Sequence, residues 1–174
     1  MLKLVGRRTE CISFCKTIEQ GVTMLKEQIL QLDNFKPDEI DIYGRLIFAK
    51  YEDIVFGLMY KIDKMITLLK QDYGTKNGAF IIHDINQGKH SERSYHYKGM
   101  AIDGHFINIP PYIVYVYASK AGFRGIGYYP DWRHAGWHFD IRQSDSISTW
   151  IGYNKDGAQE YDYGIRGFIE TIRK

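Results

Sequence analysis

The stretch from about Tyr51 to Asp72 constrains the fold more than any other part of the chain. Its apolar residues recur at steps of three and four, which is the spacing of one face of an amphipathic α-helix. The members of this stripe are Val55, Leu58, Met59, Ile62, Met65, Ile66 and Leu69. Glu52 and Asp53 in the first turn, with Gly74 just past the end, are typical helix boundaries. The chain must therefore bury one face of a long helix.

Short apolar and β-branched runs follow this helix and predict strands. They cover residues 79–85, 102–107, 125–129 and 137–142. The polar stretch 86–95 between the first two runs predicts a loop. Together with the helices, these strands predict an α+β fold, with a small and mostly antiparallel sheet flanked by helices.

Three further helices are predicted. Residues 17–33 carry an apolar stripe at helical spacing, with Thr17 and Gln20 at the spacing of a capping box. Residues 110–122, which open with a pair of prolines, predict a helix, although residues 113–117 fit a strand equally well by propensity. Residues 165–173 predict a last helix. The length of 174 residues fits a single domain, in which a helical N-terminal extension (1–45) precedes the core (46–174).

Charge and composition exclude several classes of protein. The 23 basic and 21 acidic residues give a net charge of +2, so the chain is not expected to bind nucleic acid. Cys11 and Cys15 have no nearby histidine and are expected to be free thiols. No apolar run is long enough for a signal peptide or a membrane span. The protein is therefore expected to be made in the cytoplasm without a signal peptide.

Two histidines and one aspartate have the residue types of a catalytic zinc site. His96 and Asp103 are seven residues apart, with Gly99 and Ala101 between them, and His138 follows 35 residues after Asp103. The small intervening residues allow the backbone to turn and bring both side chains to one point. Three protein ligands leave one position on zinc open for water.

The segment around His138 predicts two faces of a strand. Because side chains alternate along a strand, His138, Asp140 and Arg142 should share one face. The intervening Trp137, Phe139 and Ile141 should then face the core. Polar groups on one such face must be hydrated, paired or bound to metal. The polar set is therefore expected to line a site.

These residues resemble a known family. The run from Ser94 to Asp103 resembles the S-x-H-x-x-G-x-A-x-D signature of the zinc D-Ala-D-Ala carboxypeptidase family. That family includes murein endopeptidases, phage endolysins, the vancomycin-resistance dipeptidase and the hedgehog signalling domain. The stretches 125–130 and 136–142 are similar to the G-x-G-Y-Y-P and F-V-H-x-D-x-R motifs of its murein-peptidase branch. The resemblance covers roughly residues 51–150 and implies a hedgehog/DD-peptidase-like zinc fold.

The resemblance implies the metal ligands and leaves the general base open. His96, Asp103 and His138 fall on the three zinc-ligand positions, and Ser94 and Gly99 fall on positions that shape the ligand loop. Many relatives carry an acidic general base three residues before the last histidine, where this chain has Ala135.

Asp140 is then the first candidate for the catalytic role, as a residue that orients the water or holds a ligand histidine. His134 and Asp131, in the loop before the strand, are the alternatives.

The substrates implied by the resemblance are the stem peptides of peptidoglycan, cut by an endopeptidase or a carboxypeptidase. Arg93, Arg142 and Ser94 are expected to contact the substrate, and Lys89 is a further cation near the motifs. Aromatic residues that could wall a groove are Tyr95, Tyr97, Tyr128 and Tyr129. A phage lysis enzyme or a virion-associated enzyme would fit a chain without a signal peptide.

Two other functions remain open from the sequence. A non-catalytic module, for example within a virion, could keep zinc as a structural element and use the groove for binding, and Ala135 favours this alternative. A metal-dependent nuclease would need carboxylate-rich Mg²⁺ ligation and a basic surface, and the chain shows neither.

Overall fold

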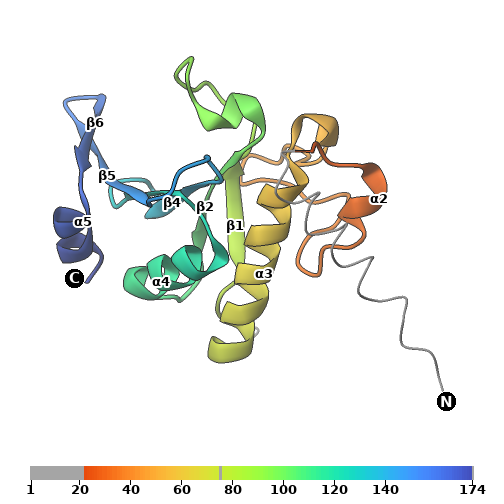
Figure 1. The fold of residues 1–174 in the computed structure, drawn as a ribbon, viewed down its shortest axis with the longest axis horizontal. Helices are drawn as coiled ribbons and strands as arrows, with labels where there is room; N and C mark the ends of the chain where they lie inside the picture. Colours follow the sequence, from red (N-terminus) through yellow and green to blue (C-terminus); the bar gives the residue numbers. More distant parts are fainter. Residues whose placement is uncertain (1–21, 75, 174) are drawn as a thin grey trace.

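The computed structural model of the chain describes residues 22–74 and 76–173. Within them the fold is α+β, as predicted, and it is built on one six-stranded mixed sheet with the strand order β1-β2-β4-β3-β5-β6 (Figure 1). The strands are β1 (Phe80–Asp84), β2 (Ala101–Phe106), β3 (Gly125–Tyr129), β4 (Gly136–Asp140), β5 (Ser148–Lys155) and β6 (Ala158–Tyr163). β3 and β5 run parallel, and the other four neighbouring pairs are antiparallel.

One face of this sheet belongs to the hydrophobic core. Buried side chains from the strands, such as Ile82, Ile102 and Phe139, join those of three helices in a single cluster. The helices are α3 (Phe56–Tyr73), α4 (Pro111–Ala121) and α5 (Ile165–Ile172). Because side chains alternate along a strand, the residues between these core positions point to the opposite face, which is left for the site.

The long helix α3 begins later than predicted. Tyr51–Asp53 form a short 3-10 helix, and α3 starts only at Phe56. The reason is that Thr23 and Val55 form an isolated β-bridge, and the Met24 amide donates to the Ile54 carbonyl at 2.6 Å. The predicted stripe is otherwise confirmed, since its members from Leu58 to Leu69 are buried.

The predicted helix over 17–33 is wrong within the described residues. Only α2 (Lys26–Ile29) is helical there, and residues 17–21, with the expected capping box, lie outside the described part, as do Cys11 and Cys15. Pairing of residues 22–24 with 54–56 keeps the first part extended. The Asn34 amide donates to Asp63 on α3 at 2.7 Å, which fixes the chain after α2 in a turn. Tertiary contacts thus override the local apolar period.

The later elements follow the prediction closely. The strand predicted at 137–142 ends at Asp140, so Arg142 lies just beyond β4. Pro111–Ala121 form the helix α4 rather than a strand, with a proline at its first turn and Gly122 in the left-handed region (φ 85°) at its C-cap. The hairpin of β5 and β6 was not predicted. Every residue of β6 is exposed, so that strand has no apolar face to reveal it in the sequence. In the described part of the chain, no helix is both long and apolar enough to cross a bilayer.

Candidate metal centre

His96, Asp103 and His138 meet at one point on the open face of the sheet. His96 lies in a 3-10 helix (Tyr95–Lys98), Asp103 lies on β2 and His138 lies on β4. Asp103 Oδ1 is 3.1 Å from His96 Nε2 and 2.8 Å from His138 Nδ1, and the two nitrogens are 3.1 Å apart. Asp103 and His138 are direct partners in the pairing of β2 and β4. The three residues predicted as ligands are therefore brought together.

Local sequence fixes the loop that carries His96. The Ser94 hydroxyl accepts a hydrogen bond from the His96 amide at 3.3 Å and so caps the short helix. Gly99 has a φ of 62°, and a Cβ atom there would lie 1.8 Å from the Asp53 carbonyl oxygen. Only glycine fits this turn.

Hydrogen bonds outside the cluster determine which nitrogen of each imidazole faces the centre. His96 Nδ1 is 2.5 Å from the Ile85 carbonyl oxygen and must donate to it, which leaves the Nε2 lone pair free. His138 Nε2 donates to Asp140 Oδ2 at 3.1 Å, so Nδ1 is the nitrogen that faces the centre. Both inner nitrogens, His96 Nε2 and His138 Nδ1, point at Asp103. Metal-binding histidines in proteins are held by the same kind of outer hydrogen bond.

Electrostatics at the cluster favour a bound cation. Burial opposes ionisation of Asp103, but the adjacent imidazoles outweigh burial and hold its pKa well below the usual range. Burial also lowers the pKa of an imidazole, yet the hydrogen bonds of His138 to Asp103 and Asp140 raise its pKa to about 9. A proton is therefore held between two carboxylates at the position where a metal ion would replace it.

The donor set fits zinc. Two imidazole nitrogens and one carboxylate oxygen are common Zn²⁺ ligands, and bonds of about 2.0–2.1 Å in a tetrahedron place such atoms roughly 3.3 Å apart. The observed separations of 2.8 to 3.1 Å are close to that value. The site can accept the ion with small side-chain shifts.

Asp140 lies behind His138 and does not face the centre. Its carboxylate is fully buried, and Arg142 donates to it through Nε at 2.8 Å and through Nη2 at 2.5 Å. Burial raises the pKa of Asp140, but these bonds outweigh it and hold the pKa below the usual range. A Cβ atom at Gly125 on the adjacent strand would lie 2.1 Å from Asp140, so this glycine makes room for the carboxylate. Asp140 is therefore placed to hold the ligand His138.

The other two residues predicted as alternatives to Asp140 lie apart from the cluster. Asp131 is exposed and accepts a hydrogen bond from the Asn154 amide at 3.2 Å. The His134 ring stacks on His105 with the centroids 4.9 Å apart. His105 in turn bonds His83 through ring nitrogens 2.7 Å apart. His83 lies where the pairing of β1 and β2 shifts register, an irregularity that turns its side chain toward His105.

A pair that the sequence analysis missed lies beside the ligands. His90 Nε2 is 2.5 Å from Asp84 Oδ2, and the His90 ring stacks flat on the ligand His96, with centroids 3.9 Å apart and planes 2° apart. The Tyr97 hydroxyl accepts from the His90 amide and donates to its carbonyl, each at 3.0 Å. Asp84 is held by Arg45 at 3.2 Å. The only sequence signal was a histidine six residues before His96, in a loop with no periodicity.

Asp84, His90 and His96 form a second group of potential metal ligands, but its geometry argues against a shared ion. A metal ion lies in the plane of each imidazole that binds it. The rings of His90 and His96 are parallel and stacked, so no point lies in both planes. His90 is therefore a neighbour of the metal centre rather than a fourth ligand.

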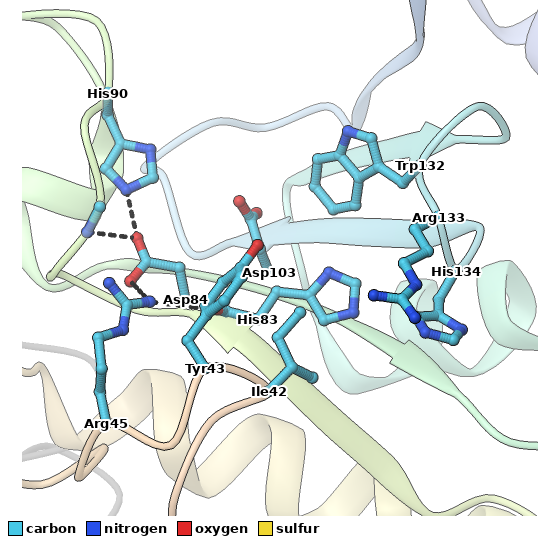
Figure 2. A pocket seen from close by; sticks show the side chains of 11 residues that line it. Ile42, Tyr43, Arg45, His83, Asp84, His90, Asp103, Trp132, Arg133 and His134 are labelled. Carbon is cyan, nitrogen blue, oxygen red and sulfur yellow. Dashed lines mark hydrogen bonds and ion pairs between the residues drawn. The ribbon is translucent and has the colours of Figure 1, made fainter.

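Two cavities meet at the centre, because His90, Asp103 and Trp132 line both. The first hollow, of about 640 Å³, is also lined by Ile42, Tyr43, Arg45, His83, Asp84, Gly88, Arg133 and His134 (Figure 2). The second hollow, of about 780 Å³, is also lined by Lys89, Ser91, Arg93, Ser94, Tyr95, His96, Tyr129, His138, Arg142, Ser148, Trp150, Gln159, Tyr161 and Tyr163.

The three residues predicted to bind substrate all line the second hollow. Arg93 and Ser94 line it, and Arg142 lines it while paired to Asp140. Tyr95 and Tyr129 also line it, whereas Tyr97 holds the His90 backbone. Tyr128 is on the core face, packed on Trp137 at 4.7 Å, so its predicted place in the groove is wrong.

Comparison with known proteins does not assign this chain to a family. No family model matches the chain, and no match was found among curated proteins or among solved structures. The function must therefore be inferred from the site.

Proposed function

We propose that the protein is a zinc-dependent peptidase that hydrolyses peptide bonds in the stem peptides or cross-links of bacterial peptidoglycan. The observation that carries the proposal is the convergence of His96 Nε2, His138 Nδ1 and Asp103 Oδ1, with both histidines held from behind, at the junction of two open hollows. The resemblance of the ligand motifs to the zinc carboxypeptidase family supports the choice of substrate.

The bound ion would supply Lewis-acid chemistry, which lowers the pKa of a water ligand to about 7 and polarises a carbonyl. His96, Asp103 and His138 would hold it. Asp140 and Arg142 would keep His138 in the required tautomer and orientation.

His90 is the group best placed to move protons. Its Nε2 is bound to Asp84, which leaves Nδ1 as the nitrogen available to a reacting group, and the side chain lines both hollows. His90 would accept a proton at Nδ1 and later donate it to the leaving amine, while Asp84 stabilises the imidazolium, as a carboxylate does in hydrolytic triads. This assignment supplies a base in a chain that has Ala135 where relatives carry an acid.

Cations of the second hollow would bind the carboxylates of the substrate. Lys89 and Arg93 are exposed there, whereas the charge of Arg142 is committed to Asp140. Among the described residues that line this hollow, Asp103 is the only carboxylate, and it would be a metal ligand.

The test is release of new amines from purified peptidoglycan by zinc-loaded protein, with mass spectrometry of the products. We expect turnover by the wild type and none by His96→Ala. His90→Gln should retain its zinc and lose about 10²- to 10⁴-fold in rate, the usual contribution of general acid–base catalysis. No amine release by zinc-loaded wild type would refute the peptidase, and full activity of His90→Gln would refute the assigned base.

A second candidate is a zinc-stabilised module of the same fold that binds without turnover, for example within a virion. Ala135 at the position of the missing acid favours it. Binding of peptidoglycan fragments without hydrolysis, together with a large loss of thermal stability on chelation, would select this alternative.

A further inference from the structure

The second hollow has a lining that differs from an ordinary peptide groove. Within residues 22–74 and 76–173, its large apolar side chains are all tyrosine and tryptophan, with no aliphatic side chain and no phenylalanine in the lining. Tyrosine and tryptophan present a flat apolar face together with a polar edge. The hollow is therefore suited to a ligand that is apolar on its faces and polar around its rim.

The outer wall of the hollow consists of two exposed tyrosines on the β5–β6 hairpin. Tyr161 and Tyr163 are 48% and 71% exposed, and their ring centroids are 6.0 Å apart. Trp150, opposite Tyr163 in the strand pairing, lies 6.5 Å from it and continues the aromatic surface inward. His138 lies 5.2 Å from Trp150, so the surface runs from the metal centre to the edge of the sheet.

The sequence builds the floor of this surface with glycines. A Cβ atom at Gly127 would lie 2.4 Å from the Trp150 ring, and one at Gly152 would lie 2.3 Å from the Tyr129 ring. Both rings therefore lie flat against a neighbouring strand. Trp150 Nε1 donates to the Tyr129 hydroxyl at 3.0 Å, which fixes the two rings relative to each other.

Polar side chains surround the aromatic surface. Gln159, Ser148 and Ser91 line the hollow beside the rings, and Lys89 and Arg93 stand on its other wall. An amide, hydroxyl groups and cations of this kind can bond a rim of hydroxyl, acetamido and carboxylate groups.

We propose that the second hollow binds an amino-sugar glycan, whose pyranose rings lie on Tyr161 and Tyr163. A pyranose has a C–H face that packs on an aromatic ring and an equatorial rim of hydroxyl and acetamido groups. The choice of amino sugars rests on the proposed function, because in peptidoglycan the stem peptide is attached to such a sugar. A peptide bond at the metal centre would then belong to the part of the stem close to the glycan.

Two other occupants fit less well. A peptide with apolar side chains would need aliphatic pockets, and the lining residues that the structure describes supply none. A single-stranded nucleic acid would use the same rings, but it also requires a row of cations along its backbone. Here two exposed cations, Lys89 and Arg93, stand beside the rings.

The test uses the full chain stripped of metal, titrated with the tetramer of N-acetylglucosamine and followed by tryptophan fluorescence. Two of the three tryptophans of the chain, Trp132 and Trp150, line the hollow, so binding should change the signal. Tyr161→Ala/Tyr163→Ala should weaken binding at least tenfold. Tyr112→Ala is the matched control, because Tyr112 is 46% exposed on α4, away from the hollow, and it should bind like the wild type.

Saturable binding of the tetramer that depends on the two tyrosines supports the proposal. No saturable binding by wild type, or equal binding by the double variant, would overturn it. A preference for an oligouridylate over the tetramer would also overturn it. Metal and turnover play no part in this measurement, so a positive result without peptidase activity would remove the proposed function and leave the glycan site standing. A peptidase without glycan binding would do the reverse.

Discussion

Five of the six histidines of the chain form two groups with different chemistry, and the sixth, His90, stacks on His96. His96 and His138 share a carboxylate, Asp103, and each has its second nitrogen held by an acceptor. His83 and His105 bond to each other, and His134 only stacks on His105. Proximity of imidazoles is common to both groups. What distinguishes the first group is that His96 Nε2 and His138 Nδ1 both face one carboxylate, so that a cation replacing the proton of His138 would meet all three groups.

The largest expected effect tests this distinction by metal content. His96→Ala and His138→Ala should each reduce bound zinc from about one ion per chain to none, because two ligands do not retain it. His83→Ala and His105→Ala are the matched controls and should keep a full complement. Elemental mass spectrometry after dialysis measures all four. Equal zinc loss in both pairs would show that the two groups do not differ in the way described.

The pH dependence of stability separates the two groups in metal-stripped protein. The pKa of His83 is lowered to about 4, first by burial and second by the neighbouring His105, whereas an unfolded histidine titrates near 6.5. The unfolded chain therefore binds more protons between these values, and stability should fall as the pH drops from 6.5 towards 4. The pKa of His138 is raised to about 9, so stability should also fall as the pH rises from 6.5 to 9.

The pH profile of the unfolding free energy should therefore have an acidic limb below pH 6.5 and an alkaline limb above it. On each limb the protein should lose at most about 3 kcal/mol, at 1.36 kcal/mol per pKa unit. Urea unfolding of stripped protein should therefore show a maximum near pH 6.5. His83→Asn should flatten the acidic limb and leave the alkaline one. A wild-type curve without an alkaline limb would contradict the assignment of a proton held between Asp103 and Asp140.

A smaller effect on zinc binding is expected from a substitution that leaves His138 in place but weakens the hydrogen bond that orients it. Asp140→Asn keeps the shape of the side chain but weakens its hold on His138 and on Arg142. Loss of such an outer partner typically lowers metal affinity 10- to 100-fold. Competition with a chelator measures this change. Asp131→Asn is the control, since Asp131 is exposed and lies apart from the cluster, and its zinc affinity should be unchanged. An unchanged zinc affinity of Asp140→Asn would mean that the charged carboxylate of Asp140 is not needed to hold His138 in place.

Sequence patterns located the three residues that converge, His96, Asp103 and His138, because strand alternation and small residues act locally. His138 and Asp140 share a face because they are two residues apart on β4, and Gly99 marks a turn that no other residue could make. The glycines of β3 were part of a recognised motif, but their physical role became visible only with the side chains of neighbouring strands. Gly125 faces Asp140 and Gly127 faces Trp150, and both contacts join segments distant in the sequence.

Other features could not be predicted, because long-range pairing decides them. The helical period of residues 22–33 was genuine, but a bridge between Thr23 and Val55 outweighed it. Asp84 and His90 come together through a loop without regular structure, and Arg45 reaches Asp84 from a segment 39 residues away. No local period encodes such contacts.

The direct pairing of Asp103 with His138 has a consequence for how the sheet chooses its alignment. Side chains on a strand alternate between faces, so a slip of one residue between β2 and β4 would turn one of these side chains into the core. Only the native alignment presents both to the same ion. Zinc would bind that alignment and none of its near neighbours, and it would lower the free energy of the native sheet by mass action. A bound ion would thus stabilise the native alignment of β2 and β4 over alignments shifted by one residue.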